Sequence, residues 1–314
     1  MTRSHVTPYC PADNPPQQSV PLTVVILTRN EEANIRQCVH SVGWASQVVV
    51  VDSGSSDDTV KIARALNAEV VQQAWLGFSA QREFALRHSV VMNNWVYFVD
   101  ADEWVSPELA AEIDFRIRSA NHAAFSHRLR LIFQGRWIRH CGWYRGSWVV
   151  RLVDRRYTHY DGSEVGERAR VNGQVGRLRH DIVDEDRKGF SSWLEKHVRY
   201  AELEALRRKR SKLSAGRHLR ILPRDRQDTR PFLRALIKDV VYPAVPMKPV
   251  ALFVYMYIAR LGLLDGRAGL RFCFYHAWYE ACVGVLAREG DVDSRNEQAL
   301  APSQGQRRLQ SHGR

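Results

Sequence analysis

Three apolar runs in the first hundred residues each end abruptly in polar residues. They are Leu22 to Leu27, Val48 to Val51 and Trp95 to Val99. Runs of this length and composition are typical of buried strands in a parallel sheet. After each polar segment, apolar residues return at helical spacing, namely Ile35, Val39 and Val42, then Val60, Ile62, Ala63 and Leu66, then Leu109, Ile113 and Ile117. The pattern predicts successive β-strand and α-helix units in an α/β fold.

The polar segments carry the candidate chemistry. They are Thr28-Arg29-Asn30-Glu31-Glu32, Asp52-Ser53-Gly54-Ser55-Ser56-Asp57-Asp58-Thr59 and Asp100-Ala101-Asp102-Glu103. In open α/β sheets, ligands bind outside the carboxyl ends of the strands. Acids at that edge can hold a divalent cation through their oxygens, and the cation can hold a diphosphate.

A second interpretation of these segments needs no ligand. Asp102 or Glu103 can complement a helix dipole in a solvated turn, and Asp52 can shape a Gly/Ser-rich loop. Asn30 and Ser55 or Ser56 are candidate helix N-caps, and Pro107 suits a first helical position.

In this order, the three motifs resemble those of the inverting glycosyltransferases of family 2, which have a GT-A fold. The resemblance covers about residues 20 to 180. It implies a GT-A-like, Rossmann-like sheet that binds a nucleotide sugar, followed by a helical membrane-proximal region. Four further segments resemble the subgroup that extends lipopolysaccharide cores and related surface glycans: Trp75-Leu76-Gly77-Phe78 with Gln81-Arg82, Gly135-Arg136-Trp137-Ile138, Gly142-Trp143-Tyr144, and, thinly, Leu263-Leu264-Asp265-Gly266.

The resemblance implies roles for the loop residues. Asp102 would bind Mg²⁺ or Mn²⁺, and Asp100 would lie on the metal or near the ribose. Thr28 and Asp52 would contact the nucleobase. The remaining nucleotide-sugar contacts would come from Asn30, Glu31, Ser53, Gly54 and Ala101. The chemistry agrees, because a metal that bridges diphosphate oxygens neutralises the charge that develops on the leaving group.

The acceptor hydroxyl needs a general base. The subgroup has a His-Glu pair for which this chain has Gly166-Glu167. Glu167 is the candidate catalytic base, and Glu164 and Asp161 are neighbouring carboxylates that could replace it. The alternative is that Glu167 is an ordinary exposed acid. The segment Tyr144-Arg145-Gly146 also lacks the Pro-Asp that usually follows this Tyr in the subgroup, so the acceptor-side loop is expected to differ.

The region after the predicted sheet is basic and aromatic. Lys188 to Arg210 has a broad apolar face, Arg207 to Arg230 is rich in Arg and Lys, and Phe232 to Tyr257 and Phe272 to Trp278 are aromatic. The longest apolar stretch, Val250 to Ala259, is far shorter than the roughly 20 residues of a spanning helix. Helices of this kind suit an anionic membrane interface. The alternative is an ordinary helical lobe packed on the catalytic domain.

Length, cysteine spacing and net charge limit the classes of protein to which this chain can belong. A chain of 314 residues can form one α/β domain and an appendage. Its five cysteines lack any Cys-x-x-Cys spacing, which argues against a disulfide framework or a zinc site. The formal net charge of +12 raises nucleic-acid binding as a rival, but no zinc-finger spacing or aromatic RNA-binding signature is present, so no nucleic-acid partner is expected.

These features predict a domain order. Residues 1–19 form a disordered lead-in without a signal peptide, 20–180 the GT-A-like domain, 181–290 the helical region, and 291–314 a disordered tail. The predicted enzyme is an inverting, metal-dependent hexosyl- or heptosyltransferase that moves a sugar from a nucleotide sugar to a saccharide or glycolipid acceptor, such as a lipopolysaccharide core. It is expected in the cytoplasm, peripheral on the inner face of the cytoplasmic membrane. The alternatives are a polyprenyl-phosphate glycosyltransferase and a non-catalytic binding descendant, the latter suggested by Gly166.

Overall fold

The computed structural model describes residues 19–118, 121–160, 169–218, 247–287 and 289. The chain divides into two compact units. The first comprises Met1–Trp193 with Met256–Phe272, and the second comprises Leu194–Tyr255 with Cys273–Arg314. Most of the expected lead-in and tail lie outside the described residues.

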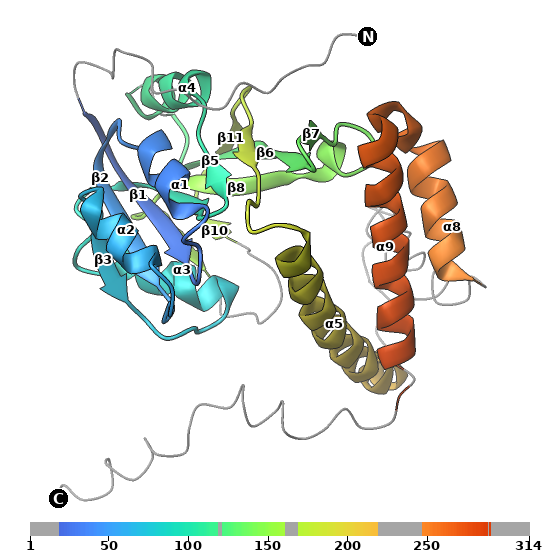
Figure 1. The fold of residues 1–314 in the computed structure, drawn as a ribbon. Helices are drawn as coiled ribbons and strands as arrows, with labels where there is room; N and C mark the ends of the chain where they lie inside the picture. The colour runs from blue at the N-terminus through green and yellow to red at the C-terminus, as the bar shows by residue number, and fades with distance from the viewer. Residues whose placement is uncertain (1–18, 119–120, 161–168, 219–246, 288, 290–314) are drawn as a thin grey trace, which may run out of the picture. The chain divides into compact units, whose positions relative to one another are not determined.

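The first unit begins with a parallel sheet whose strands alternate with helices (Figure 1). Neighbouring strands follow the order β3-β2-β1-β4. The predicted βα series is confirmed, and Pro107 does begin a helix. The elements are β1 (Val20–Thr28), α1 (Ile35–Ser41), β2 (Ala45–Asp52), α2 (Thr59–Ala65), β3 (Glu69–Gln72), α3 (Phe78–Arg87), β4 (Trp95–Asp100) and α4 (Pro107–Arg118).

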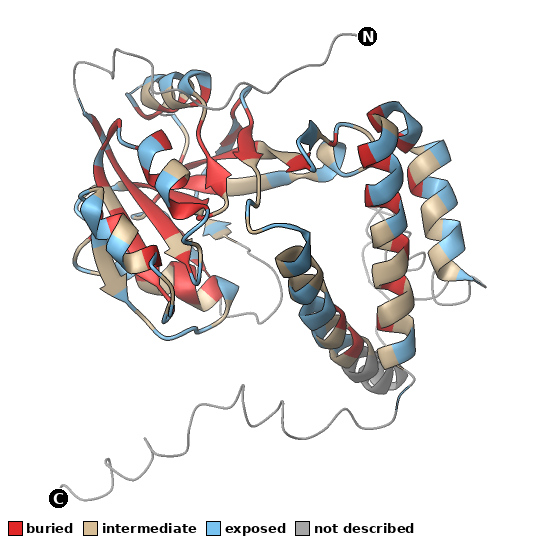
Figure 2. Cartoon of the chain, viewed as in Figure 1, coloured by how far each residue is buried: buried red, intermediate tan, exposed pale blue. Residues whose placement is uncertain are grey.

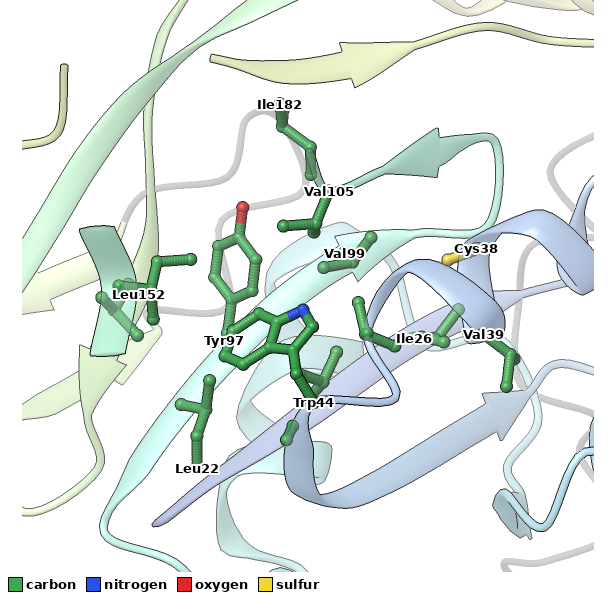
Figure 3. Packing of buried hydrophobic residues seen from close by; sticks show 14 of the residues in the cluster. Leu22, Ile26, Cys38, Val39, Trp44, Tyr97, Val99, Val105, Leu152 and Ile182 are labelled. Carbon is green, nitrogen blue, oxygen red and sulfur yellow. The ribbon is translucent and has the colours of Figure 1, made fainter. Parts of the chain in front are cut away.

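Apolar clusters cover both faces of this sheet. Val24 and Ile26 of β1 join a cluster with α1 and α4, whereas Val25 joins a second cluster with α3. Figure 3 shows the first cluster, where Trp44 and Tyr97 lie among Leu22, Ile26 and Val99. Because alternate residues of a strand point to opposite faces, burial on both sides explains why these strands are continuously apolar.

The register brings the polar segments to one edge of the sheet. Thr28 of β1 pairs with Asp52 of β2, and Leu27 of β1 pairs with Asp100 of β4. The three motifs therefore start within two strand spacings of one another, about 10 Å.

The sheet continues with strands that the apolar pattern did not predict. After β4 its order is β8-β6-β12-β5, and β7 and β11 also pair with β6. Most of these strands come from residues beyond the predicted βα series. Several are also very short, so their sequences give only a weak signal. The elements are β5 (Glu103–Trp104), β6 (Ala124–Phe133), β7 (Arg136–Trp137), η1 (Tyr144–Gly146), β8 (Trp148–Asp154), β11 (Val175–Arg177), β12 (Ile182–Asp184), and a separate pair, β9 (Thr158–Tyr160) with β10 (Ala169–Val171).

The sheet curls back on itself. β5 is the last strand in the order and is separated from β4 by β8, β6 and β12. Along the chain, however, only Ala101 and Asp102 lie between Asp100 and Glu103. Since the three residue steps from Asp100 to Glu103 reach about 11 Å at most, the end of the sheet must return to the carboxyl end of β4.

Long and short helices make up the C-terminal part of the chain. They are α5 (Phe190–His218), α8 (Lys248–Val254), the π-helical η3 (Tyr255–Ala259), η4 (Gly262–Asp265) and α9 (Gly266–Leu286). In the second unit, Arg208 donates two hydrogen bonds to Glu280, at 2.8 and 2.9 Å, beside packed Ala201, Ala205 and Val283.

The η4 turn is bound to the hairpin of the first unit. Asp265 is buried and accepts hydrogen bonds from the backbone N–H of His140 at 2.9 Å and from a sulfur of Cys141 at 3.6 Å, and its other oxygen lies 2.8 Å from His140 Nδ1. This contact explains the Leu-Leu-Asp-Gly motif structurally.

The helices before and after η4 expose many apolar side chains, and Figure 2 shows α8 without a buried residue. Among the described residues, no single helix has the length and hydropathy of a membrane span. The pair Lys248–Ala259 and Gly262–Leu286, bent by 74°, would meet that test together.

Candidate functional site

The loops that follow β1 and β2 bind each other. The backbone N–H of Asn30 donates to Ser55 Oγ at 2.8 Å, and the N–H of Ser56 donates to Asn30 Oδ1 at 2.8 Å. The N–H of Glu31 donates to Thr59 Oγ1, also at 2.8 Å. We call this set of contacts the loop clasp. It fixes the entrance to the sheet edge before any ligand is present.

The expectation that Asn30 and Ser55 or Ser56 cap helices is wrong. The caps are Asn34 for α1 and Asp58 for α2, and neither makes a side-chain capping bond. Asn30 has a φ of 54°, a left-handed conformation that asparagine tolerates, and its side chain is used in the loop clasp.

Asp52 shapes the second loop from within. Its carboxylate is fully buried and accepts hydrogen bonds from the N–H groups of Gly54 at 3.1 Å and Ser55 at 3.0 Å, and from the Ser55 hydroxyl. Gly54 has a φ of 81°, which favours glycine. The loop-forming role of Asp52 is thus real. A carboxylate has about four acceptor sites, so it can still accept one more hydrogen bond.

Thr28 and Ser53 lie beside Asp52. Thr28 Oγ1 is buried and has no hydrogen-bond partner among the residues that the structure describes. Ser53 Oγ accepts a hydrogen bond from Gln81 Nε2 at 3.2 Å. The structure therefore brings the residues expected at the nucleobase together at the ends of β1 and β2.

Two buried arginines hold Asp100. Arg82 of α3 donates to its Oδ1 at 3.0 Å, and Arg151 of β8 donates to Oδ1 at 3.1 Å and to Oδ2 at 2.7 Å. The side chains of Arg82 and Arg151 are only 1% and 4% exposed, whereas that of Asp100 is 33% exposed. The guanidinium fork fits a carboxylate in two-point contact, so this pairing fixes the orientation of Asp100.

Glu103 lies behind this pair. It is buried, its Oε2 accepts the backbone N–H of Asp100 at 2.8 Å, and its Oε1 lies 3.6 Å from Arg151 Nη2. Burial raises the pKa of Glu103 well above its ordinary value, and the nearby Arg151 opposes that rise. The expectation of a solvated turn is wrong for Glu103, because β5 carries it into the interior.

Asp102 lies in the turn between Asp100 and Glu103. Its backbone carbonyl accepts the N–H of Glu185 at 2.9 Å. Glu31 faces the same region, bound by Lys188 Nζ and by Asn34 Nδ2 at 2.7 Å. Burial is the largest cause that raises the pKa of Glu31, and the negative charge of Asp102 adds to it. The carboxylates of two motifs therefore interact electrostatically.

Comparison with known proteins gives a family match for part of the chain. Residues 23–148 match the family model described as Glycosyl transferase family 2. These residues form a family 2 glycosyltransferase domain. The matched range contains every site residue discussed so far except Arg151, Glu185 and Lys188.

Relatives of the glycosyltransferase domain include two bacterial glycosyltransferases. An uncharacterized glycosyltransferase of Rickettsia typhi is 40% identical over 118 residues, which cover 36% of this chain and 40% of the relative. The lipopolysaccharide core biosynthesis glycosyltransferase LpsC of Rhizobium meliloti is 32% identical over 107 residues, covering 30% of this chain and 39% of the relative. The matches thus span about two fifths of these relatives' length.

A solved structure also matches. It is glucosyl-3-phosphoglycerate synthase from Mycobacterium tuberculosis in complex with Mn²⁺, uridine diphosphate and glucosyl-3-phosphoglycerate. The identity is 23%, the TM-score is 0.32, and the match covers 35% of this chain and 44% of that chain.

The donor set of the glycosyltransferase domain fits a divalent cation only in part. Among the described residues, no group of three or more His, Cys, Asp or Glu side chains has the geometry of a metal site. Mg²⁺ is commonly held by one or two carboxylates together with substrate phosphates and water. Asp102 suits such a site. Asp100 as a second ligand would have to share its oxygens with Arg82 and Arg151.

Arg82 belongs to a sequence motif that predicts no role for it, and Arg151 lies outside the motifs. A charged residue inside the apolar strand Trp148–Asp154 is the signal that could have revealed Arg151. The proposed base Glu167 and its neighbours Asp161, Glu164 and Gly166 lie outside the described residues.

Proposed function

We propose that the protein is an inverting glycosyltransferase that moves a hexosyl or heptosyl group from a nucleotide sugar to a cell-envelope glycan, such as a lipopolysaccharide core. The observation that carries this proposal is the alignment of Thr28, Asp52 and Asp100 at one sheet edge, beside Asp102. The similarity to LpsC supports the choice of acceptor.

Each group at the edge has a part in this mechanism. Thr28 and the remaining acceptor site of Asp52 bind the nucleobase, and the loop clasp keeps Asn30, Glu31, Ser53 and Gly54 in place around the donor. Asp100, oriented by its two arginines, binds the ribose. Asp102 would hold Mg²⁺ or Mn²⁺, and Ala101 would contact the nucleotide sugar.

The bound cation would supply charge neutralisation for the departing diphosphate. Arg82 and Arg151 add two positive charges near the same edge. Glu167 removes the proton of the acceptor hydroxyl on the opposite side of the sugar, which gives inversion.

We also propose that the enzyme acts at the cytoplasmic face of the inner membrane as a peripheral protein. Apolar side chains around η3 and η4 support this, because Val250, Tyr255, Ile258 and Leu264 are all about half exposed. An anionic lipid surface would cover them. Residues 219–230 of the basic run lie outside the described residues.

The test is a panel of nucleotide sugars with and without Mg²⁺ or Mn²⁺, read by thermal stabilisation and then by transfer or hydrolysis. A ligand that binds only the native state raises the melting temperature. Stabilisation that needs the metal and is lost in Asp102→Asn supports the proposal. Asp114→Asn is the matched control, since Asp114 is paired with Arg118 on the exposed side of α4. Tight donor binding without turnover would favour the binding descendant. A lipid phosphate as the preferred acceptor would favour a polyprenyl-phosphate transferase.

A further inference from the structure

One face of the sheet around β6, where parallel and antiparallel pairs are mixed, alternates arginine and aromatic side chains. Arg128 of β6 is directly opposite Trp148 of β8. Arg177 of β11 pairs with Ser126 of β6, which puts Arg177 on the face of Arg128. The guanidinium carbons of Arg128 and Arg177 lie 5.1 and 4.9 Å from the centroid of the Trp148 ring. Both guanidinium groups therefore pack against the exposed ring of Trp148.

The series continues along the hairpin. Arg128 also lies 4.4 Å from the Tyr144 ring, the Tyr144 and Trp137 rings meet edge to face at 5.2 Å, and Arg130 lies 4.8 Å from the Trp137 ring. We call these six residues the arginine–aromatic strip: Arg177, Trp148, Arg128, Tyr144, Trp137 and Arg130.

One carboxylate supports the strip from the interior. Asp181, with a side chain 5% exposed, accepts the Tyr144 hydroxyl at 2.7 Å and lies 3.4 Å from Arg128 Nε and 3.7 Å from Arg130 Nη2. Arg139 also lies 5.3 Å from the Trp137 ring, and the carboxyl of Glu108 interacts electrostatically with Arg130. Four guanidinium groups and two carboxylates are thus associated with the strip, so two positive charges are in excess. The side chains of Arg128 and Arg130 remain 30% and 41% exposed, which leaves the excess charge open to solvent.

The arginine–aromatic strip lies close to the turn that carries Asp102. Arg130 pairs with Val183 of β12, and Val183 pairs with Trp104 of β5. Two strand spacings correspond to about 10 Å. Trp104 is the second residue after Asp102. A ligand on the strip can thus extend toward the turn that carries Asp102.

We infer that the arginine–aromatic strip binds an anionic oligosaccharide, which presents its hydroxyl to the transfer site. This inference rests on the proposed function, and it specifies the acceptor as a glycan that bears phosphate or carboxylate groups. A guanidinium packed on a ring is held in place while its N–H edge stays available for a phosphate or carboxylate. Arg128 and Arg130 are two residues apart on β6, about 7 Å, so they can engage two anionic groups of one chain.

The same geometry disfavours nucleic acid. Single strands bind largely by stacking bases on aromatic faces. In the strip, Trp148, Tyr144 and Trp137 each already pack against at least one guanidinium group. The rings therefore hold the arginines in position, and the guanidinium groups contact the ligand.

Calorimetric titration of the full chain tests this inference. The probes are tetragalacturonate for carboxylates, a 6-phosphorylated mannopentaose for phosphates, and neutral maltopentaose. Arg128→Gln removes the central guanidinium, and Arg177→Gln removes one at the exposed end, where folding is least at risk. Arg64→Gln is the matched control, because Arg64 is exposed on the last turn of α2, beside β3 at the other edge of the sheet.

At least one anionic probe should bind about tenfold more tightly than maltopentaose, and Arg128→Gln and Arg177→Gln should each lose most of that preference, with Arg64→Gln unchanged. Which anionic probe binds more tightly identifies the acidic group. Equal binding of the neutral probe, no effect of either strip variant, or tighter binding of a single-stranded oligoribonucleotide that Arg128→Gln abolishes would each overturn the inference. Metal-dependent donor stabilisation, measured on the same variants, should stay at the wild-type level. If the wild type showed no metal-dependent donor stabilisation, the proposed function would be refuted. The glycan titrations would still test whether the strip binds an anionic oligosaccharide.

Discussion

Arg151 and Asp100 form a two-point ion pair between β8 and β4, with Nη1–Oδ1 and Nη2–Oδ2 distances of 3.1 and 2.7 Å. The two residues are 51 positions apart, and the pair joins the antiparallel half of the sheet to the edge where the donor would bind. The parallel half alone therefore does not complete the site.

Replacing Arg151 by Met is expected to destabilise the fold by about 3 kcal/mol, because it removes the guanidinium group that Asp100 and Glu103 share, leaving Arg82 beside Asp100. This is the low end of the range for buried pairs, since Asp100 is a third exposed. Arg151→Lys keeps the charge but loses the fork, so it should cost less. Urea unfolding measures both. The control Arg118→Met, which removes an exposed helical pair, should cost under about 1 kcal/mol, and an equal loss there would contradict the account.

Glu103→Gln is expected to change the pH dependence of stability. Burial raises the pKa of Glu103 well above its ordinary value of 4.5, so the native state binds the proton more tightly than the unfolded state. The stability that this proton contributes is present below about pH 4.5 and is lost as pH rises through the native pKa. Urea unfolding between about pH 4 and pH 8 should show wild-type stability falling relative to Glu103→Gln as pH rises. Parallel curves would show that Glu103 ionises normally.

Asp102→Asn should abolish metal-dependent donor binding and leave the fold intact, because it keeps the shape and removes the charge. Asp100→Asn should be severe as well, but it should also lower the unfolding free energy, since it removes the carboxylate charge that pairs with the two buried guanidinium groups of Arg82 and Arg151. Donor titrations with Mg²⁺ or Mn²⁺, together with urea unfolding, separate the two effects. Near wild-type turnover in Asp102→Asn would show that the metal assignment is wrong.

Glu167→Gln should lower turnover by about 10² to 10⁴ with almost no change in donor affinity, because a general base acts on the acceptor proton in the transition state. Steady-state kinetics with a fixed donor measures the first quantity, and donor titration measures the second. Full activity in Glu167→Gln combined with an equivalent loss in Glu164→Gln would transfer the role to Glu164.

The full chain should co-sediment with anionic vesicles, and high salt should weaken but not abolish the binding. Each Lys or Arg near such a surface contributes about 1 kcal/mol, which salt screens over a Debye length of about 8 Å, whereas buried apolar surface adds a part that salt does not screen. A chain that ends near residue 185 should stay in the supernatant. Equal sedimentation of both chains, or release by detergent alone, would point to another mode of attachment.

Much of the sheet edge that carries Thr28, Asp52 and Asp100 was predictable, because it depends on local sequence patterns. Apolar runs fixed β1, β2 and β4, and parallel pairing then aligned Thr28, Asp52 and Asp100. The contacts of Arg82 and Arg151 with Asp100 were not predictable in this way, since they depend on how distant strands and helices pack. For the same reason, sequence left open the alternative that Glu103 lies in a solvated turn, whereas its two-residue strand pairs with β12 in the interior.

The loop clasp constrains how the glycosyltransferase domain can be re-engineered. The backbone N–H of Ser56 donates to Asn30 Oδ1, and the backbone N–H of Glu31 donates to Thr59 Oγ1. If only one of these loops were transplanted from another glycosyltransferase, it would supply one partner of each hydrogen bond, and the matching partner on the other loop would be missing. Exchanging donor preference therefore requires grafting residues 28–32 and 52–59 together, as one cassette.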